Sequence, residues 1–337
     1  MAVMNRIAFA LIATAVVVQA APTPAKSLLV LSKGELTLSI VDPVSLKVLA
    51  SMPSGPDPHE VVASSDGKFA YISNYGGGQY NTITVVDLIA QTTVETVDLG
   101  GLRGPHGLMY SGGKVWFTAE PNKAIGTLDG ATRKVDWVLG TGQDRTHMIW
   151  VTNDQKKFYT TNVNAATVSI IERTTVAAGR GGRGSPQGEW SQTVVPVGKG
   201  AEGFDVSPDG KELWTADAGD GTVTVIDLAS KKVVKTIAAN VKGANRLKFA
   251  PDGKHAFIST LSGPNATVID SATRAVIKTI AIGRGAAGIE MQPDGVRVFI
   301  ACTPDSYVTT IDLKTLEVTG KFEAGKNPDG MIWSEIR

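Results

Sequence analysis

The sequence has one cysteine, almost no net charge and none of several common cofactor or catalytic motifs. Its single cysteine, Cys302, rules out an internal disulfide, and it ends the apolar run VFIAC, where we expect a small buried residue. The 33 basic and 32 acidic side chains leave a formal net charge of +1, which argues against nucleic acid as the main partner. No phosphate-binding glycine loop, GxSxG or CxxCH occurs, and without CxxCH a covalently attached c-type haem is excluded.

Long hydrophobic runs are also scarce, and the longest lies at the N-terminus. An early arginine, an apolar run over residues 7–18 and small residues around Ala20 predict a secretory signal peptide over residues 1–20, or at most to residue 25. The run is short for a membrane span, so we expect no span in the mature chain. The protein is therefore expected to be secreted, periplasmic or on the cell surface.

No segment has a helical period, whereas an apolar–acidic dipeptide recurs along the chain. Its acidic residues are spaced by 45, 42, 43, 55, 43 and 42 residues and are Asp42, Asp87, Asp129, Glu172, Asp227, Asp270 and Asp312. The long spacing places an insertion, a Gly/Arg loop at about residues 173–190, in the fourth unit. Seven copies of one unit indicate a repeat architecture.

Each unit contains the same series of strands. An Asp-Gly turn precedes a strand with an aromatic centre, such as FAYIS or ELWTA, and a strand alternating Thr with Val or Ile follows, such as TVTVID. The aromatic residues should fill the gaps between neighbouring units. Four strands in each of seven units predict an all-β, seven-bladed β-propeller over residues 26–337. Residues 329–333 read as an inner strand that closes the N-terminal blade, and the closed ring should be a monomer.

The repeats SDGKFAYISNYGGGQYNTITVVDL and PDGKELWTADAGDGTVTVIDL resemble the YVTN-type β-propeller family over essentially all of the mature chain. That resemblance implies the fold; its relatives include surface-layer and secreted bacterial proteins, binding modules and parts of redox enzymes. Residues 115–129 are also similar to a blade of the streptogramin lyases. Lactonase propellers similarly place His and Glu before successive inner strands, as His147 and Glu202 are placed here.

Aligned units bring three of the four histidines to one position. The residue just before each inner strand is His59, His106, His147, Glu202, Asn245, Ala287 and Asp329. Equivalent positions in a propeller form a ring around the axis, at the face where the central channel opens. Three imidazoles and the carboxylate of Glu202 are the ligand set of many zinc and copper sites. The same set could serve acid–base chemistry, line a metal-free polar pocket, or simply hold turns.

Other polar groups are predicted to line the same mouth. They come from the loop after the aromatic strand and from positions beside the ring, and are Asn74, Tyr75, Glu120, Asn162, Asp217, Arg103, Arg145 and Arg246. Deeper in the channel, Asp205, Lys248 and Glu290 occupy equivalent places in apolar inner strands and should face water or one another.

Three functions remain open from the sequence. The leading hypothesis is an exported propeller that binds a small ligand, a metal or a protein partner at the channel mouth. The first alternative is a lactonase- or lyase-like enzyme, with His147 as general base and Glu202 orienting it or a metal. The second is a cell-surface scaffold.

Overall fold

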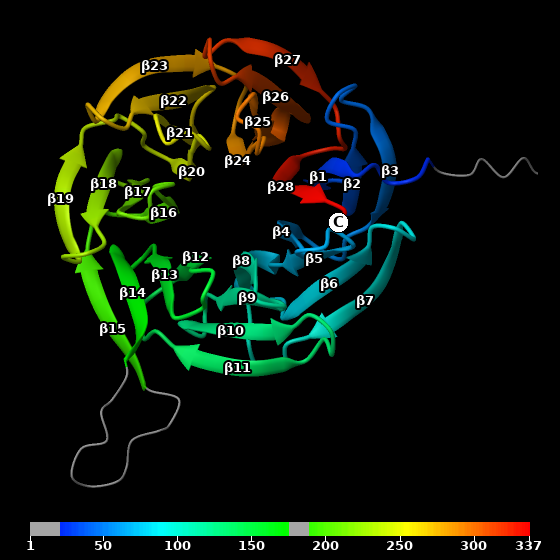
Figure 1. The fold of residues 1–337 in the computed structure, drawn as a ribbon, viewed down its shortest axis with the longest axis horizontal. Helices are drawn as coiled ribbons and strands as arrows, with labels where there is room; N and C mark the ends of the chain where they lie inside the picture. The colour runs from blue at the N-terminus through cyan, green and yellow to red at the C-terminus, as the bar shows by residue number, and fades with distance from the viewer. Residues whose placement is uncertain (1–20, 175–188) are drawn as a thin grey trace, which may run out of the picture.

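The computed structural model describes residues 21–174 and 189–337. The predicted signal peptide (residues 1–20) and most of the predicted insertion (residues 175–188) lie outside this part. Seven four-stranded antiparallel sheets surround a central axis (Figure 1), which confirms the predicted all-β seven-bladed propeller. No helix of the described residues is both long enough and apolar enough to cross a membrane.

The first blade joins the two ends of the chain, as predicted. Its strand order is β28-β1-β2-β3, so the C-terminal strand is the innermost strand of the N-terminal blade. β28 pairs with β1 from Lys26 opposite Glu335 to Ser32 opposite Pro328. The four strands are β28 (Pro328–Glu335), β1 (Lys26–Ser32), β2 (Thr37–Val41) and β3 (Val48–Pro53).

The other six blades each use four consecutive strands, from the axis outward. Blades 2 and 3 consist of β4 (Pro58–Ala63), β5 (Phe69–Asn74), β6 (Thr82–Asp87), β7 (Thr92–Asp98), β8 (Pro105–Ser111), β9 (Lys114–Ala119), β10 (Ala124–Asp129) and β11 (Val135–Gly140). Blades 4 and 5 consist of β12 (Thr146–Val151), β13 (Lys157–Asn162), β14 (Thr167–Thr174), β15 (Glu189–Pro196), β16 (Ala201–Val206), β17 (Glu212–Asp217), β18 (Thr222–Asp227) and β19 (Lys232–Ile237). Blades 6 and 7 consist of β20 (Ala244–Phe249), β21 (His255–Thr260), β22 (Asn265–Asp270), β23 (Ala275–Ala281), β24 (Ala286–Met291), β25 (Arg297–Cys302), β26 (Tyr307–Asp312) and β27 (Val318–Phe322). Two short 3-10 helices, η1 (Gly76–Gly78) and η2 (Thr303–Asp305), follow second strands.

The recurring aspartate of the sequence repeat ends the third strand and shapes the turn to the fourth. In blade 1, Asp42 Oδ1 accepts hydrogen bonds from the backbone N–H groups of Val44 and Ser45, at 2.8 and 2.7 Å. Such a side-chain-stabilised turn is what aspartate favours. In blade 4 the residue is Glu172, which instead pairs with Lys157 and Lys231, in the blade whose outer hairpin carries the insertion.

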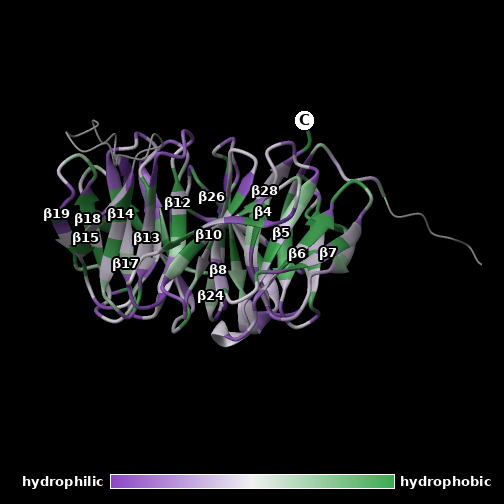
Figure 2. Cartoon of the chain, turned by 90° about the horizontal axis from the view of Figure 1, so that it is seen from below, coloured by the Kyte–Doolittle hydropathy of each residue, from purple (hydrophilic) through white to green (hydrophobic). Residues whose placement is uncertain are grey.

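Apolar side chains pack between neighbouring blades, and the aromatic positions lie in these interfaces as predicted. Tyr71 of blade 2 packs with Val115 and Phe117 of blade 3, and Trp214 of blade 5 packs with Leu247 of blade 6. Figure 2 shows apolar residues along the strands and polar residues at the loops of both faces. Burial of these rings is the main source of stability in such a fold.

Glycines bring the inner strands close together just below the channel mouth. Gly107, Gly203, Gly288 and Gly330 occupy equivalent positions in four inner strands. A Cβ on any of them would lie 2.2–2.6 Å from backbone atoms of the next blade's inner strand. Only glycine permits this approach. The approach also brings ring side chains one residue earlier into contact across blades, as with His106 and His147 and with Asp329 and His59.

Candidate functional site

The seven aligned positions form a ring at the start of the inner strands. Each is the second residue of its strand, whereas the sequence predicted the residue just before the strand. In blades 2–7 the pairing with the second strand shifts register there, for example between Pro58 and Val61. Such an irregularity re-aims side chains and is frequent beside functional sites.

The backbone two residues before each ring position has a positive φ in every blade. Four blades have glycine there, and the other three have Asp57 (φ 43°), Arg145 (φ 56°) and Asn327 (φ 52°). Aspartate and asparagine tolerate this conformation, whereas a long side chain such as arginine rarely adopts it. Arg145 is thus held in a costly conformation next to the ring.

The three ring histidines are in contact, as the alignment predicted. The ring centroids of His59 and His106 are 4.4 Å apart, and those of His106 and His147 are 3.8 Å apart. The ring of Tyr75 stacks on His59 and meets His106 edge-on, both at 5.1 Å. His106 and His147 are each only 1% exposed.

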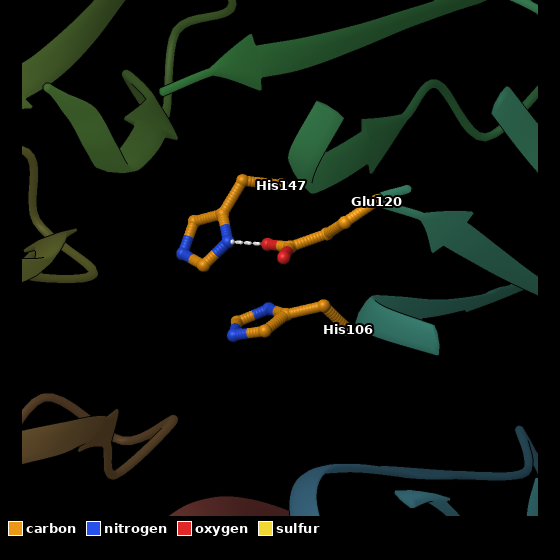
Figure 3. Close-up of side chains that lie close together, drawn as sticks. All are labelled: His106, Glu120 and His147. Carbon is orange, nitrogen blue, oxygen red and sulfur yellow. Dashed lines mark hydrogen bonds and ion pairs between the residues drawn. The ribbon is translucent and has the colours of Figure 1, made fainter. Parts of the chain in front are cut away.

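Carboxylates flank both ends of this row. His147 Nδ1 hydrogen-bonds Glu120, and His147 Nε2 lies 2.6 Å from Glu202 Oε2, without hydrogen-bond geometry (Figure 3 shows the Glu120 contact). At the other end, His59 Nδ1 lies 3.0 Å from Asp329 Oδ2.

Two cationic side chains each form ion pairs with two carboxylates beside the row. Arg145 lies 3.5 Å from Glu120 and 3.5 Å from Glu202. Lys33 lies 3.0 Å from Asp57 and 3.3 Å from Asp329, and its Nζ is 2.5 Å from His59 Nδ1.

The two buried histidines differ in their affinity for protons. Burial and the neighbouring His147 hold the pKa of His106 well below its usual value, so His106 is neutral. Burial also disfavours charge on His147, but Glu202 and Glu120 outweigh it and raise its pKa. Burial would raise the pKa of Glu202, yet His147 and Arg145 lower it to about 2. The His147 end of the row therefore favours a positive charge between two carboxylates.

One ring nitrogen of His106 is a candidate ligand atom. Its Nδ1 is buried and has no hydrogen-bond partner among the described residues. Ligand atoms of His106, Glu120 and His147 all lie within 4.8 Å of one another (Figure 3). A buried, unpaired imidazole nitrogen beside a second imidazole and a carboxylate is a donor set suited to zinc or copper.

The loop after the second strand contributes differently from what the sequence predicted. Asn74, Asn162 and Asp217 end their second strands, are fully buried, and hydrogen-bond hydroxyl groups of their own blades. Asn74 also donates to the carbonyl of Ser54, in the connection between blades 1 and 2. The next residue along reaches the ring: Tyr75 in blade 2 and Glu120 in blade 3, joined by a 2.5 Å hydrogen bond from the Tyr75 hydroxyl to Glu120. Lys33, the equivalent residue of blade 1, was missed by sequence reasoning, although the same alignment points to it.

The remaining predicted residues lie beside or below the ring. Asn245 has its Oδ1 buried without a hydrogen-bond partner in the described part of the chain. Arg103 makes only a backbone hydrogen bond to Asn122 among the described residues. Arg246 is buried and pairs with Glu60 of blade 2, 186 residues away in sequence. This pair crosses the channel from blade 6 and forms a floor beneath the ring.

Comparison with known proteins supports the fold and leaves the function open. No protein-family model and no curated protein matches the chain. Solved structures do match: a functionally unknown protein from Desulfotomaculum acetoxidans is 12% identical, with 92% of this chain and 99% of that chain covered and a TM-score of 0.74. A putative 6-phosphogluconolactonase from Bacteroides uniformis is 15% identical, with 91% and 99% covered and a TM-score of 0.74. The dihydro-heme d1 dehydrogenase NirN is 16% identical, with 95% and 77% covered and a TM-score of 0.63.

These identities are too low to carry more than the fold. The chain is similar to these propellers in architecture. The resemblance to the YVTN-type family continues to rest on the repeats alone.

Proposed function

We propose that the ring face binds a divalent transition metal, zinc or copper, through His106, His147 and Glu120. The observation that carries the proposal is the close approach of their ligand atoms together with the buried, unpaired Nδ1 of His106. Leaving such an atom unsatisfied costs about 1–3 kcal/mol, which a bound metal would recover. Glu202 and His59 stand next to this set and are the candidates for further ligands.

The charge of the site supports a cation. The groups joined to the three histidines by the contacts above are four carboxylates and two cations, namely Asp57, Glu120, Glu202, Asp329, Lys33 and Arg145. With the histidines neutral, two negative charges are in excess, and it is these carboxylates that raise the pKa of His147. A divalent cation would balance these two negative charges, whereas an anionic ligand would add to them.

A purely structural role for the histidines has less support. In the described part of the chain, no ring nitrogen of His59, His106 or His147 hydrogen-bonds a backbone carbonyl. A metal-free polar pocket would leave His106 Nδ1 without a partner unless its ligand supplied one. The export predicted from residues 1–20 remains part of the proposal.

The test is elemental analysis of the mature protein, purified without tag or chelator. We expect about one zinc or copper per chain, lost in His106→Ala and His147→Ala. The matched control is His255→Ala, which removes the one histidine outside the ring and should keep the metal. A metal-free protein whose melting temperature does not rise with added zinc or copper would overturn the proposal, as would equal binding by His106→Ala.

A second candidate is metal-assisted hydrolysis at the same ring. The observation that favours it is Arg145, whose side chain is 35% exposed next to the buried carboxylates and could orient an anionic substrate. The putative lactonases of the same fold make lactones the first substrates to try. Hydrolysis should require the loaded metal and be lost in His147→Ala; turnover that persists in that variant would remove His147 from the reaction.

A further inference from the structure

A second ring of side chains lies deeper in the channel, and its two halves differ in character. Three residues beyond each ring position, blades 1–4 contribute apolar side chains and blades 5–7 contribute charged ones. In blade order they are Ile332, Val62, Met109, Trp150, Asp205, Lys248 and Glu290. In blades 2–7 each of these residues lies opposite the aromatic residue of the second strand, such as Trp150 opposite Tyr159 and Lys248 opposite Phe257. The wall of the channel is therefore apolar on one side and charged on the other.

Two neighbouring cavities lie at this level and share lining residues. A small one of about 80 Å³ lies directly beneath the Glu60–Arg246 pair. A larger one of about 470 Å³ opens at the far ends of the inner strands, opposite the histidine face. Both are lined by Trp150, Lys248 and Ile332. The larger volume is within the range of small-molecule sites, which are mostly apolar with a few placed polar groups.

Lys248 is the charged residue that lines both cavities. The larger cavity is also lined by Glu335 and Arg337, which pair with each other at 3.5 Å. No hydrogen bond or ion pair within 4.0 Å joins its Nζ to another described residue, although it lines both cavities. The neighbouring acids are already engaged: Asp205 accepts backbone N–H bonds from Val206 and Phe249, both at 3.0 Å. Glu290 accepts one from Trp333 at 3.0 Å. The ammonium is thus the group left to meet a ligand.

We propose that the channel end opposite the histidines is a second binding site, for a small molecule with an aromatic body and a carboxylate head. The aromatic body would pack against Trp150 and Trp333, and the carboxylate would bind Lys248. Tyr110 and Met109 complete the apolar wall of the larger cavity. This site is separated from the ring by the buried Glu60–Arg246 pair and is independent of any metal there.

Lys248 presents an ammonium without a close partner among the described residues to both cavities, so the contact a ligand makes there favours an anionic group. Asp205 raises the pKa of Lys248 and balances its charge. Burial raises the pKa of Glu290 to about 7, so this carboxyl can take up a proton at neutral pH when an anionic ligand binds beside it. A ligand amine would have to approach the Lys248 ammonium, a like-charge contact that costs affinity.

The experiment compares three probes with the same body. Binding of 3-phenylpropanoate, 3-phenylpropylamine and 3-phenylpropan-1-ol to the mature protein is measured by calorimetry and by tryptophan fluorescence. We expect 3-phenylpropanoate to bind best, and Lys248→Met to weaken it by about tenfold or more. Trp150→Ala should weaken the binding of all three probes, because it removes a contact of the aromatic body that they share. The matched control, Lys211→Met, removes an exposed lysine and should change nothing.

The outcomes separate this site from the ring. Retained binding in His106→Ala supports the proposal; loss there but not in Lys248→Met would place the ligand on the histidine face and overturn it. Equal or tighter binding of the amine or the alcohol would overturn the carboxylate class. No binding of any probe at 5 mM or so, the range of weak millimolar affinity, would also overturn it. If Lys248→Met fails to fold, Lys248→Arg should bind and Lys248→Gln should not.

Discussion

Replacing Asp217 with asparagine should make the protein more stable at neutral and alkaline pH. Asp217 ends β17 and is fully buried. Its Oδ2 accepts hydrogen bonds from the hydroxyls of Thr222 and Thr224, at 2.9 and 2.7 Å. Its Oδ1 is buried without a partner among the described residues. The equivalent residue of blade 2 is Asn74, whose amide donates to the carbonyl of Ser54 at 2.9 Å.

The expected size follows from the pKa of Asp217. Burial raises this pKa from 3.8 to about 6, so ionisation costs the folded protein about 2 pKa units, or about 3 kcal/mol. Because the folded-state pKa is raised, the stability is complete below pH 3.8 and is lost as the pH rises through 6. Asparagine does not ionise and avoids this loss. Its amide needs an acceptor of its own, so about 3 kcal/mol is an upper value.

The assay is chemical denaturation of the wild type and Asp217→Asn at pH 5, 6, 7 and 8. The stability advantage of the variant over the wild type should grow as the pH rises from 5 and should level off above pH 7. The reciprocal change, Asn74→Asp, should introduce the same pH-dependent loss in blade 2. A variant that is no more stable than the wild type at pH 8, or a difference that does not vary with pH, would refute the reasoning.

Three further changes test the framework around the site by thermal melting. Gly288→Ala should lower stability by about 1–3 kcal/mol because its Cβ would meet backbone of the next blade, whereas Gly140→Ala, which meets nothing, should not. Arg145→Gly should raise stability by about 1 kcal/mol by relieving a left-handed backbone; a clear fall would mean that its contacts outweigh the strain. Arg246→Leu should cost about 3–5 kcal/mol by stranding Glu60, and adding Glu60→Leu should recover most of it; no recovery would contradict a pairing across the channel.

Much of the fold could be read from the sequence because its signals are local. In six of the seven repeats an aspartate, such as Asp42, accepts a hydrogen bond from the backbone N–H three positions later, so the spacing of this acidic position counts the blades. The aromatic residue of the second strand is also a local signal, and it marks the interfaces between blades. Equivalence between repeats then places His59, His106 and His147 side by side, although 41 or more residues separate them.

The site itself was only partly predictable, because one residue decides where a strand side chain points. Asn74 turns into its own blade, while Tyr75, its neighbour, reaches the histidines. The sequence grouped the two together. The pairing of Arg246 with Glu60 also had no signal, since it joins blades on opposite sides of the axis and depends on the diameter of the ring.

The repeat provides its own control for what the histidines do. Blade 7 has Ala287 at the ring position and blade 6 has Asn245, and both have glycine at the positive-φ position two residues earlier. These blades build the same strand and the same register shift without an imidazole, a carboxylate or a strained arginine. The strand start therefore does not need His106 or His147. Buried histidines and carboxylates that the strand start does not need, gathered in consecutive blades, support the binding role proposed above.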